Sequence, residues 1–201
     1  MKKATYIALA FLLQACLGDL PTQPRLTQTD GHIQPDISVE NKQGLVESYE
    51  DCGQRVGFTP CNIKLQDQND LPWQLYDSYG KIIVLDFSTL WCGVCVRAAN
   101  KFQDILDDYP DIDIVWATIL LQDQYGNLPN LDHARFWAET FNIVHSPVLA
   151  ADITMVKLMD DHKYLITTLP TIIVIDEDMV IQYIMQGWNE ARVRAYLDKL
   201  M

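Results

Sequence analysis

Positively charged residues are scarce in this sequence. Its 201 residues include 15 lysines and arginines against 27 aspartates and glutamates, which gives a formal net charge of −12. So acidic a surface repels phosphate backbones and anionic lipid headgroups, and nucleic acid is therefore excluded as an expected partner. Internal repeats and low-complexity runs are also absent. We interpret the acidity as an ordinary solvated surface.

The N-terminal apolar run is too short to cross a bilayer. Residues 4–13 provide ten residues after Lys2 and Lys3, whereas a spanning helix needs about 20. A short positive segment followed by a short apolar one is instead typical of an export signal. Over the whole chain, hydrophobic residues make up 49% and charged residues 21%. This composition argues against disorder and predicts one domain of ordinary size with appendages.

A cysteine follows the apolar run in the sequence Leu13-Gln14-Ala15-Cys16. These four residues resemble the bacterial lipobox, in which the signal is cut before the cysteine and the cysteine is lipidated. The resemblance implies a signal peptide over residues 1–15 and a lipid on Cys16. The alternative is a plain secretory signal that leaves Cys16 as a free thiol.

The next stretch has no helical or strand period and is rich in glutamine, threonine, proline and glycine. We therefore expect residues 16–50 to form a flexible tether and residues 51–201 to form the folded domain. A tether of this kind lets an anchored domain reach partners in solution.

The cysteine count of five is odd for an exported protein. Assigning Cys16 to a lipid leaves an even set of four in a compartment where disulfides persist. Cys52 and Cys61 flank a loop with two glycines and a proline, and we expect a structural disulfide between them. Spacing alone does not show that their Cβ atoms approach. A redox pair that exchanges with the other two cysteines, and two unpaired thiols, therefore remain open.

An apolar, mostly β-branched run beginning at Ile82 predicts a buried strand. This run leads to Trp91 and then to the motif Cys92-Gly93-Val94-Cys95. After the motif, apolar residues at spacings of three and four predict a helix over 96–106. Cys92 would thus lie at a helix N-terminus, where free N–H groups and the helix dipole favour a thiolate. The pattern predicts a redox site.

The strand-helix-strand pattern across the motif predicts a parallel unit with a right-handed crossover. Later segments predict a short helix capped by Asp152, an antiparallel hairpin and a last helix capped by Asn189. The expected strands are 62–67, 82–87, 112–121, 171–176 and 179–184, with an extended piece at 142–149, and the later helices are 131–141, 153–159 and the stretch after Asn189.

The motif Trp91-Cys92-Gly93-Val94-Cys95 after a strand, with Leu169-Pro170-Thr171 opening a later one, resembles the thioredoxin fold. The lipoprotein signal, the N-terminal strand and an inserted segment between about residues 123 and 161 look like its exported TlpA/ResA-like branch. The resemblance implies an α/β fold with a central mixed β-sheet flanked by helices, an N-terminal β extension and a helical insertion. It also implies thiol-disulfide exchange with no cofactor beyond the dithiol.

Carried over residue by residue, the resemblance makes Cys92 the exposed nucleophile and Cys95 the buried resolving thiol. Pro170 matches the family's cis-proline, which faces the dithiol. Asp86 matches a buried acid that would take the proton from Cys95, although a purely structural acid is equally compatible with the pattern. Trp91, Leu169 and Thr171 are the expected substrate-binding residues. The sequence differs from the usual thioredoxin pattern at two positions, because Val94 replaces a proline and Ser88 replaces a tryptophan.

The expected function is the reduction of disulfides in proteins of the bacterial envelope. The protein would act as a monomer that its lipid holds at the membrane. A membrane thiol-disulfide donor would restore its dithiol after each reaction. Strong oxidases of this fold resemble Cys-Pro-His-Cys, whereas Gly93 and Val94 supply no charge, which favours a reductase. Leu17 gives no inner-membrane retention signal of the aspartate type. Attachment to the outer membrane, facing the periplasm, is therefore favoured.

Several rival functions remain. A disulfide oxidase or isomerase would use the same dithiol. A copper-delivery or other metal-delivery protein would add His145 or His162, but such members resemble Cys-x-x-x-Cys, and we expect no metal site. A peroxidase would resemble Pro-x-x-x-Thr-x-x-Cys. Thr89 matches the threonine of this pattern relative to Cys92, but Leu85 stands where the proline should be, which argues against a peroxidase. An intact Cys-x-x-Cys argues against a redox-inactive lipoprotein.

Overall fold

The structure is a computed structural model that describes residues 52–151, 164 and 166–201. The predicted signal peptide, Cys16, the whole predicted tether, the helix expected over 153–159 and His162 lie outside these residues. Within the described ranges, no helix is long and apolar enough to cross a bilayer. The elements are β1 (Lys64–Gln66), β2 (Pro72–Gln74), the 3-10 helix η1 (Leu75–Ser78), β3 (Ile82–Ser88), α1 (Gly93–Ala99), α2 (Phe102–Asp107), β4 (Ile114–Leu120), α3 (Leu131–Thr140), β5 (Val148–Ala150), β6 (Thr171–Ile175), β7 (Ile181–Gln186) and α4 (Glu190–Leu197).

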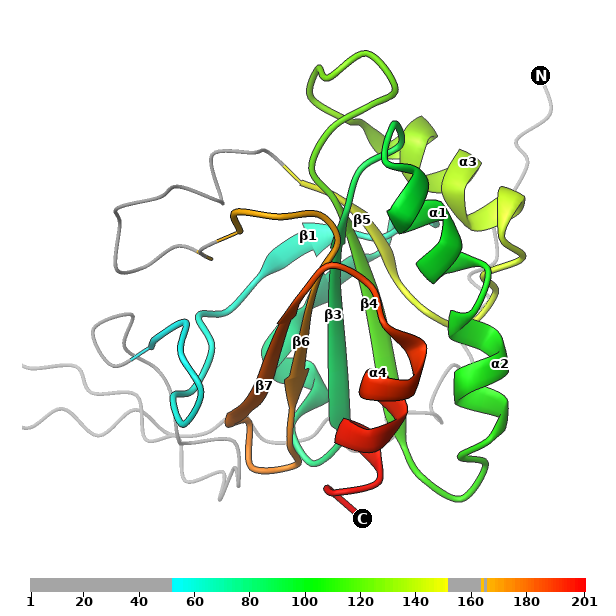
Figure 1. Ribbon diagram of the computed structural model, residues 1–201. Coiled ribbons are helices and arrows are strands. Elements are labelled where there is room, and N and C mark those ends of the chain that lie inside the picture. The colour runs from blue at the N-terminus through cyan, green and yellow to red at the C-terminus, as the bar shows by residue number, and fades with distance from the viewer. Residues whose placement is uncertain (1–51, 152–163, 165) are drawn as a thin grey trace, which may run out of the picture. The chain divides into compact units, whose positions relative to one another are not determined.

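The main sheet has the strand order β5-β4-β3-β6-β7 (Figure 1). Its central strand β3 pairs in parallel with β4 and antiparallel with β6. The predicted mixed sheet, the parallel strand-helix-strand unit and the β6–β7 hairpin are therefore confirmed. The N-terminal β extension is also present, because β1 and β2 form a separate two-stranded sheet.

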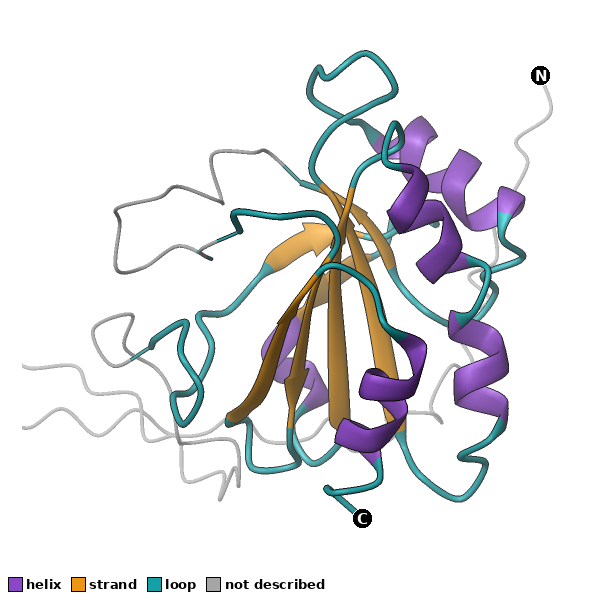
Figure 2. Ribbon diagram, viewed as in Figure 1, coloured by secondary structure: helices purple, strands orange, loops and turns teal. Residues whose placement is uncertain are grey.

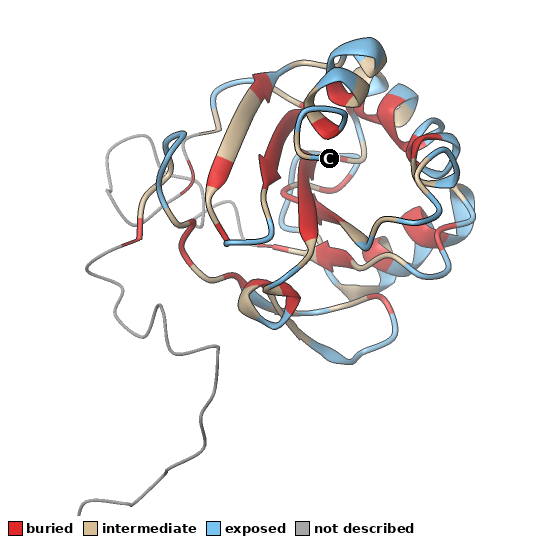
Figure 3. Ribbon diagram, turned by 90° about the horizontal axis from the view of Figure 1, so that it is seen from below, coloured by how far each residue is buried: buried red, intermediate tan, exposed pale blue. Residues whose placement is uncertain are grey.

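Both faces of the main sheet are buried. Figure 2 shows the helices α1 to α4 gathered on one face, where their apolar sides pack on β3, β4 and β6. The opposite face is covered by residues around β1 and η1, such as Ile63 and Leu75, together with Tyr164. Figure 3 shows this burial through the strands, while each helix keeps an exposed side. A strand buried on both faces reads as a continuous apolar run, which explains why β3 was predictable.

The single helix predicted over 96–106 is wrong, because the chain forms α1 and α2 with a break between them. Asn100 donates its side-chain N–H to the Val96 carbonyl at 2.8 Å, and the Lys101 amide bonds to the Ala98 carbonyl at 2.9 Å. A side chain that bonds the backbone competes with helical hydrogen bonds, and the i−3 bond tightens the turn.

Several predicted boundaries shift while the elements persist. The strand predicted over 112–121 is β4, and the extended piece over 142–149 is reduced to β5. The last helix is capped as predicted, since the Asn189 side chain accepts the Arg192 amide at 2.9 Å. Val193 and Leu197 are its buried residues.

The segment before β3 covers parts of both sheet edges. At the β5 edge, Asp67 forms a bridge with Leu149, and the Gln68 side chain accepts the Val148 amide at 2.8 Å. At the β7 edge, Ile181 exchanges backbone hydrogen bonds with Gly57 and Phe58 at 2.8 and 2.9 Å. Such contacts occupy polar groups that an open edge would present to another chain.

Candidate redox site

The two motif cysteines lie where β3 gives way to α1. Cys92 is the N-cap of α1, and its Sγ accepts the Cys95 amide at 3.2 Å. The two sulfurs are bonded to each other, and the Cα atoms are 5.2 Å apart. Cys92 keeps 6% of its surface exposed, whereas Cys95 is fully buried. Cys92 is therefore less exposed than expected in this oxidised state, but it is the one of the pair that reaches solvent.

The sheet brings other segments to the same edge. Ser88 lies opposite Leu120 in the parallel pairing, and Phe87 lies opposite Thr171 in the antiparallel pairing. The C-terminal ends of β3 and β4 and the N-terminal end of β6 consequently share one edge (Figure 1). The Leu169–Pro170 peptide bond is cis and immediately precedes β6. Pro170 thus belongs to the edge that carries Cys92.

The residues flanking Pro170 are held by the fold. Thr171 is fully buried, and its hydroxyl donates to the Thr168 carbonyl at 2.6 Å. The Pro170 carbonyl accepts the Gly187 amide at 2.7 Å. Leu169 is partly buried and packs against the apolar clusters on both faces of the sheet. Because the Thr171 side chain is enclosed, it can support this turn but offers no surface to a substrate.

Asp86 is buried in β3, on the same face as Val84 and the apolar cluster that contains both motif cysteines. Burial raises the pKa of Asp86 from 3.8 to about 7. Two polar groups oppose this rise. The buried Ser88 hydroxyl donates to Asp86 Oδ1 at 2.7 Å, and the Trp116 indole N–H also favours the charged form, although it lies outside hydrogen-bond geometry.

Gln122 is a site residue that the sequence analysis missed. Its Oε1 accepts the Trp91 indole N–H at 3.0 Å, and its Nε2 donates to the Gly126 carbonyl at 3.1 Å. The Gln122 carbonyl also accepts the Leu90 amide at 3.1 Å. The sequence signal that could have identified Gln122 is its position as a polar residue just after a strand parallel to β3. The carboxyl ends of parallel strands meet at one edge of the sheet, so such a residue lies near the motif.

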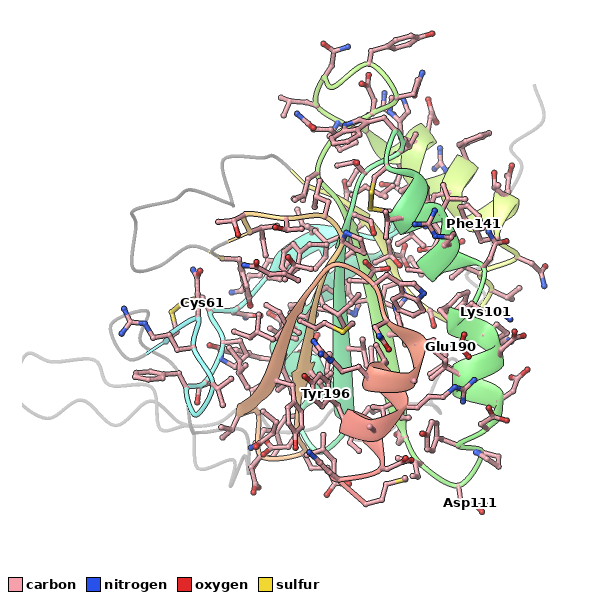
Figure 4. The ribbon with its side chains drawn as sticks, in the orientation of Figure 1. Cys61, Lys101, Asp111, Phe141, Glu190 and Tyr196 are labelled. Atoms are coloured by element: carbon pink, nitrogen blue, oxygen red, sulfur yellow. A yellow bond between two sulfur atoms is a disulfide. The ribbon has the colours of Figure 1, made fainter. Side chains whose placement is uncertain are left out.

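Cys52 and Cys61 form a disulfide, with Cα atoms 4.8 Å apart. The loop that it closes is tied to the fold by several bonds, including those from the Tyr164 and Tyr76 hydroxyls to the carbonyls of Cys61 and Pro60 at 2.7 and 2.8 Å. Figure 4 shows Cys61 on the far side of the main sheet from α1. The fold does not bring the two cysteine pairs together.

Of the residues considered for rival chemistries, Leu85, Thr89 and His145 lie among those that the structure describes. His145 is exposed in the loop before β5. Among the residues that the structure describes, no three His, Cys, Asp or Glu side chains are placed to hold a metal ion. Thr89 is buried and its hydroxyl has no hydrogen-bond partner, while its carbonyl accepts the Cys92 amide at 3.3 Å.

Comparison with known proteins finds sequence matches to thioredoxins and structural similarity to thiol-disulfide oxidoreductases. A thioredoxin from Geodia cydonium is 35% identical over 48 residues, which are 24% of this chain and 45% of that protein. The chain thus spans less than half the length of this curated relative. Among solved structures, the thioredoxin domain of a thiol-disulfide oxidoreductase from Bacteroides vulgatus has a TM-score of 0.58 at 16% identity, over 74% of this chain and 96% of that one.

A second solved structure is the exposed lipoprotein thioredoxin of Streptococcus pneumoniae, with a TM-score of 0.54 at 21% identity, over 68% of this chain and 98% of that one. These likenesses confirm the thioredoxin-like fold. The AhpC/TSA family model matches residues 56–184, which is more than half of the 201 residues. The chain therefore belongs to the AhpC/TSA family of the thioredoxin-like superfamily.

Proposed function

We propose that this protein reduces disulfides of bacterial envelope proteins through Cys92 and Cys95. The observation that carries the proposal is the position of Cys92 Sγ, which caps α1 and accepts the Cys95 amide at 3.2 Å. A hydrogen bond to sulfur at a helix start favours the thiolate over the thiol. The thiolate is the form that attacks disulfides.

The exchange proceeds in two steps. The Cys92 thiolate attacks one sulfur of the substrate disulfide, so that a mixed disulfide forms and the other substrate sulfur leaves as a thiolate. Cys95, as a thiolate, then attacks Cys92 Sγ and releases the second substrate sulfur. The substrate gains two electrons, and the protein is left with the Cys92–Cys95 disulfide, which is the state seen in the structure.

Asp86 is proposed to take the proton from Cys95 before the second step. Its position on the face of the sheet that carries the cysteine cluster supports this role. A pKa of about 7 leaves a large fraction of the carboxyl ionised, and therefore able to accept a proton, at neutral pH. Ser88 would hold the carboxylate and keep this pKa from rising further.

The substrate segment is proposed to lie between Trp91 and the turn at Pro170. Trp91 is exposed and Pro170 shares the sheet edge with Cys92. The backbone of Leu169 would pair with the extended segment, as in strand addition. Thr171 contributes by supporting the turn from within.

The direction and place of the reaction rest on the sequence. Gly93 and Val94 put no cation beside Cys92, and a reducing couple then needs a membrane thiol-disulfide donor to restore the dithiol. The lipobox-like residues before Cys16 support an envelope lipoprotein. One structural neighbour, from Streptococcus pneumoniae, is itself described as an exposed lipoprotein.

The test uses two single-cysteine variants and insulin as the disulfide substrate, with dithiothreitol as reductant. Cys92→Ser is expected to abolish catalysed reduction, because it removes the attacking sulfur. Reduced Cys95→Ser, mixed with insulin after the dithiothreitol has been removed, is expected to accumulate the mixed disulfide on Cys92, which intact mass spectrometry detects. Insulin reduction that survives in Cys92→Ser would refute the mechanism.

A further inference from the structure

A cleft lies at the β5 edge of the main sheet, away from the dithiol. Gln68 and Asn69, in the turn after β1, form one wall, and the last part of α3 with the loop that follows forms the other. Because β5 runs parallel to β4, this loop enters β5 from the end of the sheet opposite Cys92. The cleft has a volume of about 610 Å³, and ligand sites usually have about 300–1,000 Å³.

Hydrogen bonds hold both walls of the cleft in place. The Gln68 side chain donates to the Ser146 carbonyl at 3.0 Å and accepts the Val148 amide at 2.8 Å. Arg135 on α3 donates from Nε to the Gln68 carbonyl at 3.1 Å, which joins the two walls. A cleft that is already formed loses little conformational entropy when a ligand binds.

The end of α3 shapes the second wall. Asn142 has a φ of 53°, and its amide donates to the Glu139 carbonyl at 3.3 Å. The Ile143 amide donates to the Ala138 carbonyl at 2.8 Å. These two bonds around a left-handed residue form a Schellman motif, which ends a helix and turns the chain sharply. Glu139, Asn142 and Ile143 consequently all line the cleft.

Negative charge in the cleft is left without a partner. Glu139 lies in the last turn of α3, where the helix dipole is negative and no basic residue is present. Among the residues that the structure describes, its carboxylate has no hydrogen bond or ion pair. Arg135 does not neutralise it, because Nη1 of Arg135 pairs with Asp132 at 3.1 Å and Nε bonds to Gln68. A cation beside Glu139 would meet both a carboxylate and the negative end of a helix.

Apolar groups lie next to this carboxylate. Ala138 and Ile143 are buried, Val144 is 62% exposed, and all three line the cleft. The exposed Asn142 carboxamide makes no hydrogen bond within the described part of the chain, so its oxygen is open to a donor. The lining thus offers acceptors for a positive head group and an apolar strip for the chain that carries it.

We propose that this cleft binds an organic cation, namely a primary ammonium or guanidinium group on a short apolar chain. Glu139 and the Asn142 carboxamide oxygen accept hydrogen bonds from the cation, and Val144 contacts its methylene groups. The net charge of −12 draws such ligands toward the protein. Free polyamines and the basic side chains of a polypeptide share this chemistry. The inference goes beyond the proposed function, because neither motif cysteine lines the cleft.

Calorimetric titration of the full chain tests the cleft with three probes. Spermidine represents a free polyamine, and N-acetyl-lysine amide represents a polypeptide side chain. N-acetyl-norleucine amide keeps the apolar chain of lysine but lacks its ammonium group. Glu139→Gln removes the negative charge and keeps the shape of the side chain. Glu177→Gln is the matched control, because Glu177 is exposed in the turn between β6 and β7 and the net charge changes equally.

Glu139→Gln is expected to weaken binding of the charged probes about fivefold, the size expected for an ion pair that solvent reaches. Glu177→Gln should not change it, and the norleucine probe should bind the wild type more weakly than the lysine probe. Tighter binding of spermidine would assign the cleft to free polyamines, and tighter binding of the lysine probe would assign it to a polypeptide side chain.

Three results would overturn the cation site. These are a wild type that binds neither charged probe, equal binding of the lysine and norleucine probes, and equal losses in Glu139→Gln and Glu177→Gln, which would indicate general attraction to an acidic surface. Insulin reduction by Glu139→Gln should equal that of the wild type. Failure of the cation site and failure of the disulfide chemistry are therefore read from separate measurements.

Discussion

At the scale of single residues, the proposed proton transfer depends on the buried carboxyl of Asp86. Burial alone would make its ionisation costly, and the Ser88 hydroxyl offsets part of that cost. Ser88 could be recognised in the sequence only as a replacement for tryptophan. Its bond to Asp86 follows from the two-residue period of a strand, which puts residues 86 and 88 on one face.

Replacing Asp86 by Asn should make the oxidised protein more stable at neutral and alkaline pH. Because the folded pKa of about 7 exceeds the ordinary 3.8, the folded state binds the proton more tightly. Stability therefore falls as pH rises from about 4 to about 7, and the penalty is complete above that range. Urea unfolding near pH 8 should show a gain on the order of 4 kcal/mol for Asp86→Asn. A gain of equal size near pH 4 would contradict this origin.

Ser88→Ala should shift the pH dependence of the resolving step. Loss of a hydrogen bond to a charged acceptor is worth about 1.5 kcal/mol or more, so the pKa of Asp86 should rise by about one unit. Release of substrate thiol from the Cys92 mixed disulfide would then reach half-maximum about one pH unit higher. Stopped-flow rates across pH measure this shift.

The matched control places Ser88→Ala in the Asp86→Asn background, where no carboxyl titrates. There the serine change should leave the pH profile unmoved. Coincident profiles for Ser88→Ala and wild type would show that the hydroxyl does not act through Asp86.

At the scale of elements, patterns local in sequence predicted well and contacts between distant segments did not. The apolar run of β3 and the cap at Asn189 lie within a few residues of the structures they specify. The break at Asn100 depends on which way one amide side chain turns. The hydrogen bonds of Gly57 and Phe58 to β7 join segments far apart in the chain, and no local pattern reports them.

The Cys52–Cys61 disulfide should stabilise the loop that occupies the β7 edge. The bridge spans a sequence separation of 9, and closing a loop of about this length contributes roughly 2–3 kcal/mol. Cys52→Ser/Cys61→Ser should lower the free energy of unfolding by that amount in denaturant titrations. Insulin reduction at a temperature where the variant stays folded should be unchanged. A loss of catalysis by the folded variant would indicate that the second pair takes part in exchange.

At the scale of the whole molecule, the site is a product of strand register. The motif and Pro170 were identified from the sequence because both belong to short, specific patterns. Gln122 and the loop after it join them only because β3 and β4 end, and β6 begins, at one edge of the sheet. Apolar periodicity predicts that β4 exists, but it does not fix which of its final residues lies beside Trp91. The motif could therefore be predicted, while the surface around it could not.

The reduction potential of the Cys92–Cys95 couple tests the central claim most directly. A protein lacking residues 1–20 is equilibrated in glutathione buffers of graded poise, and thiol trapping with mass spectrometry reads both cysteine pairs. A disulfide reductase should give a potential near or below about −250 mV, close to the value of about −270 mV for thioredoxin, with Cys52–Cys61 closed throughout. A potential near about −120 mV, as for a strong oxidant, or a pair that never forms a disulfide, would contradict the account.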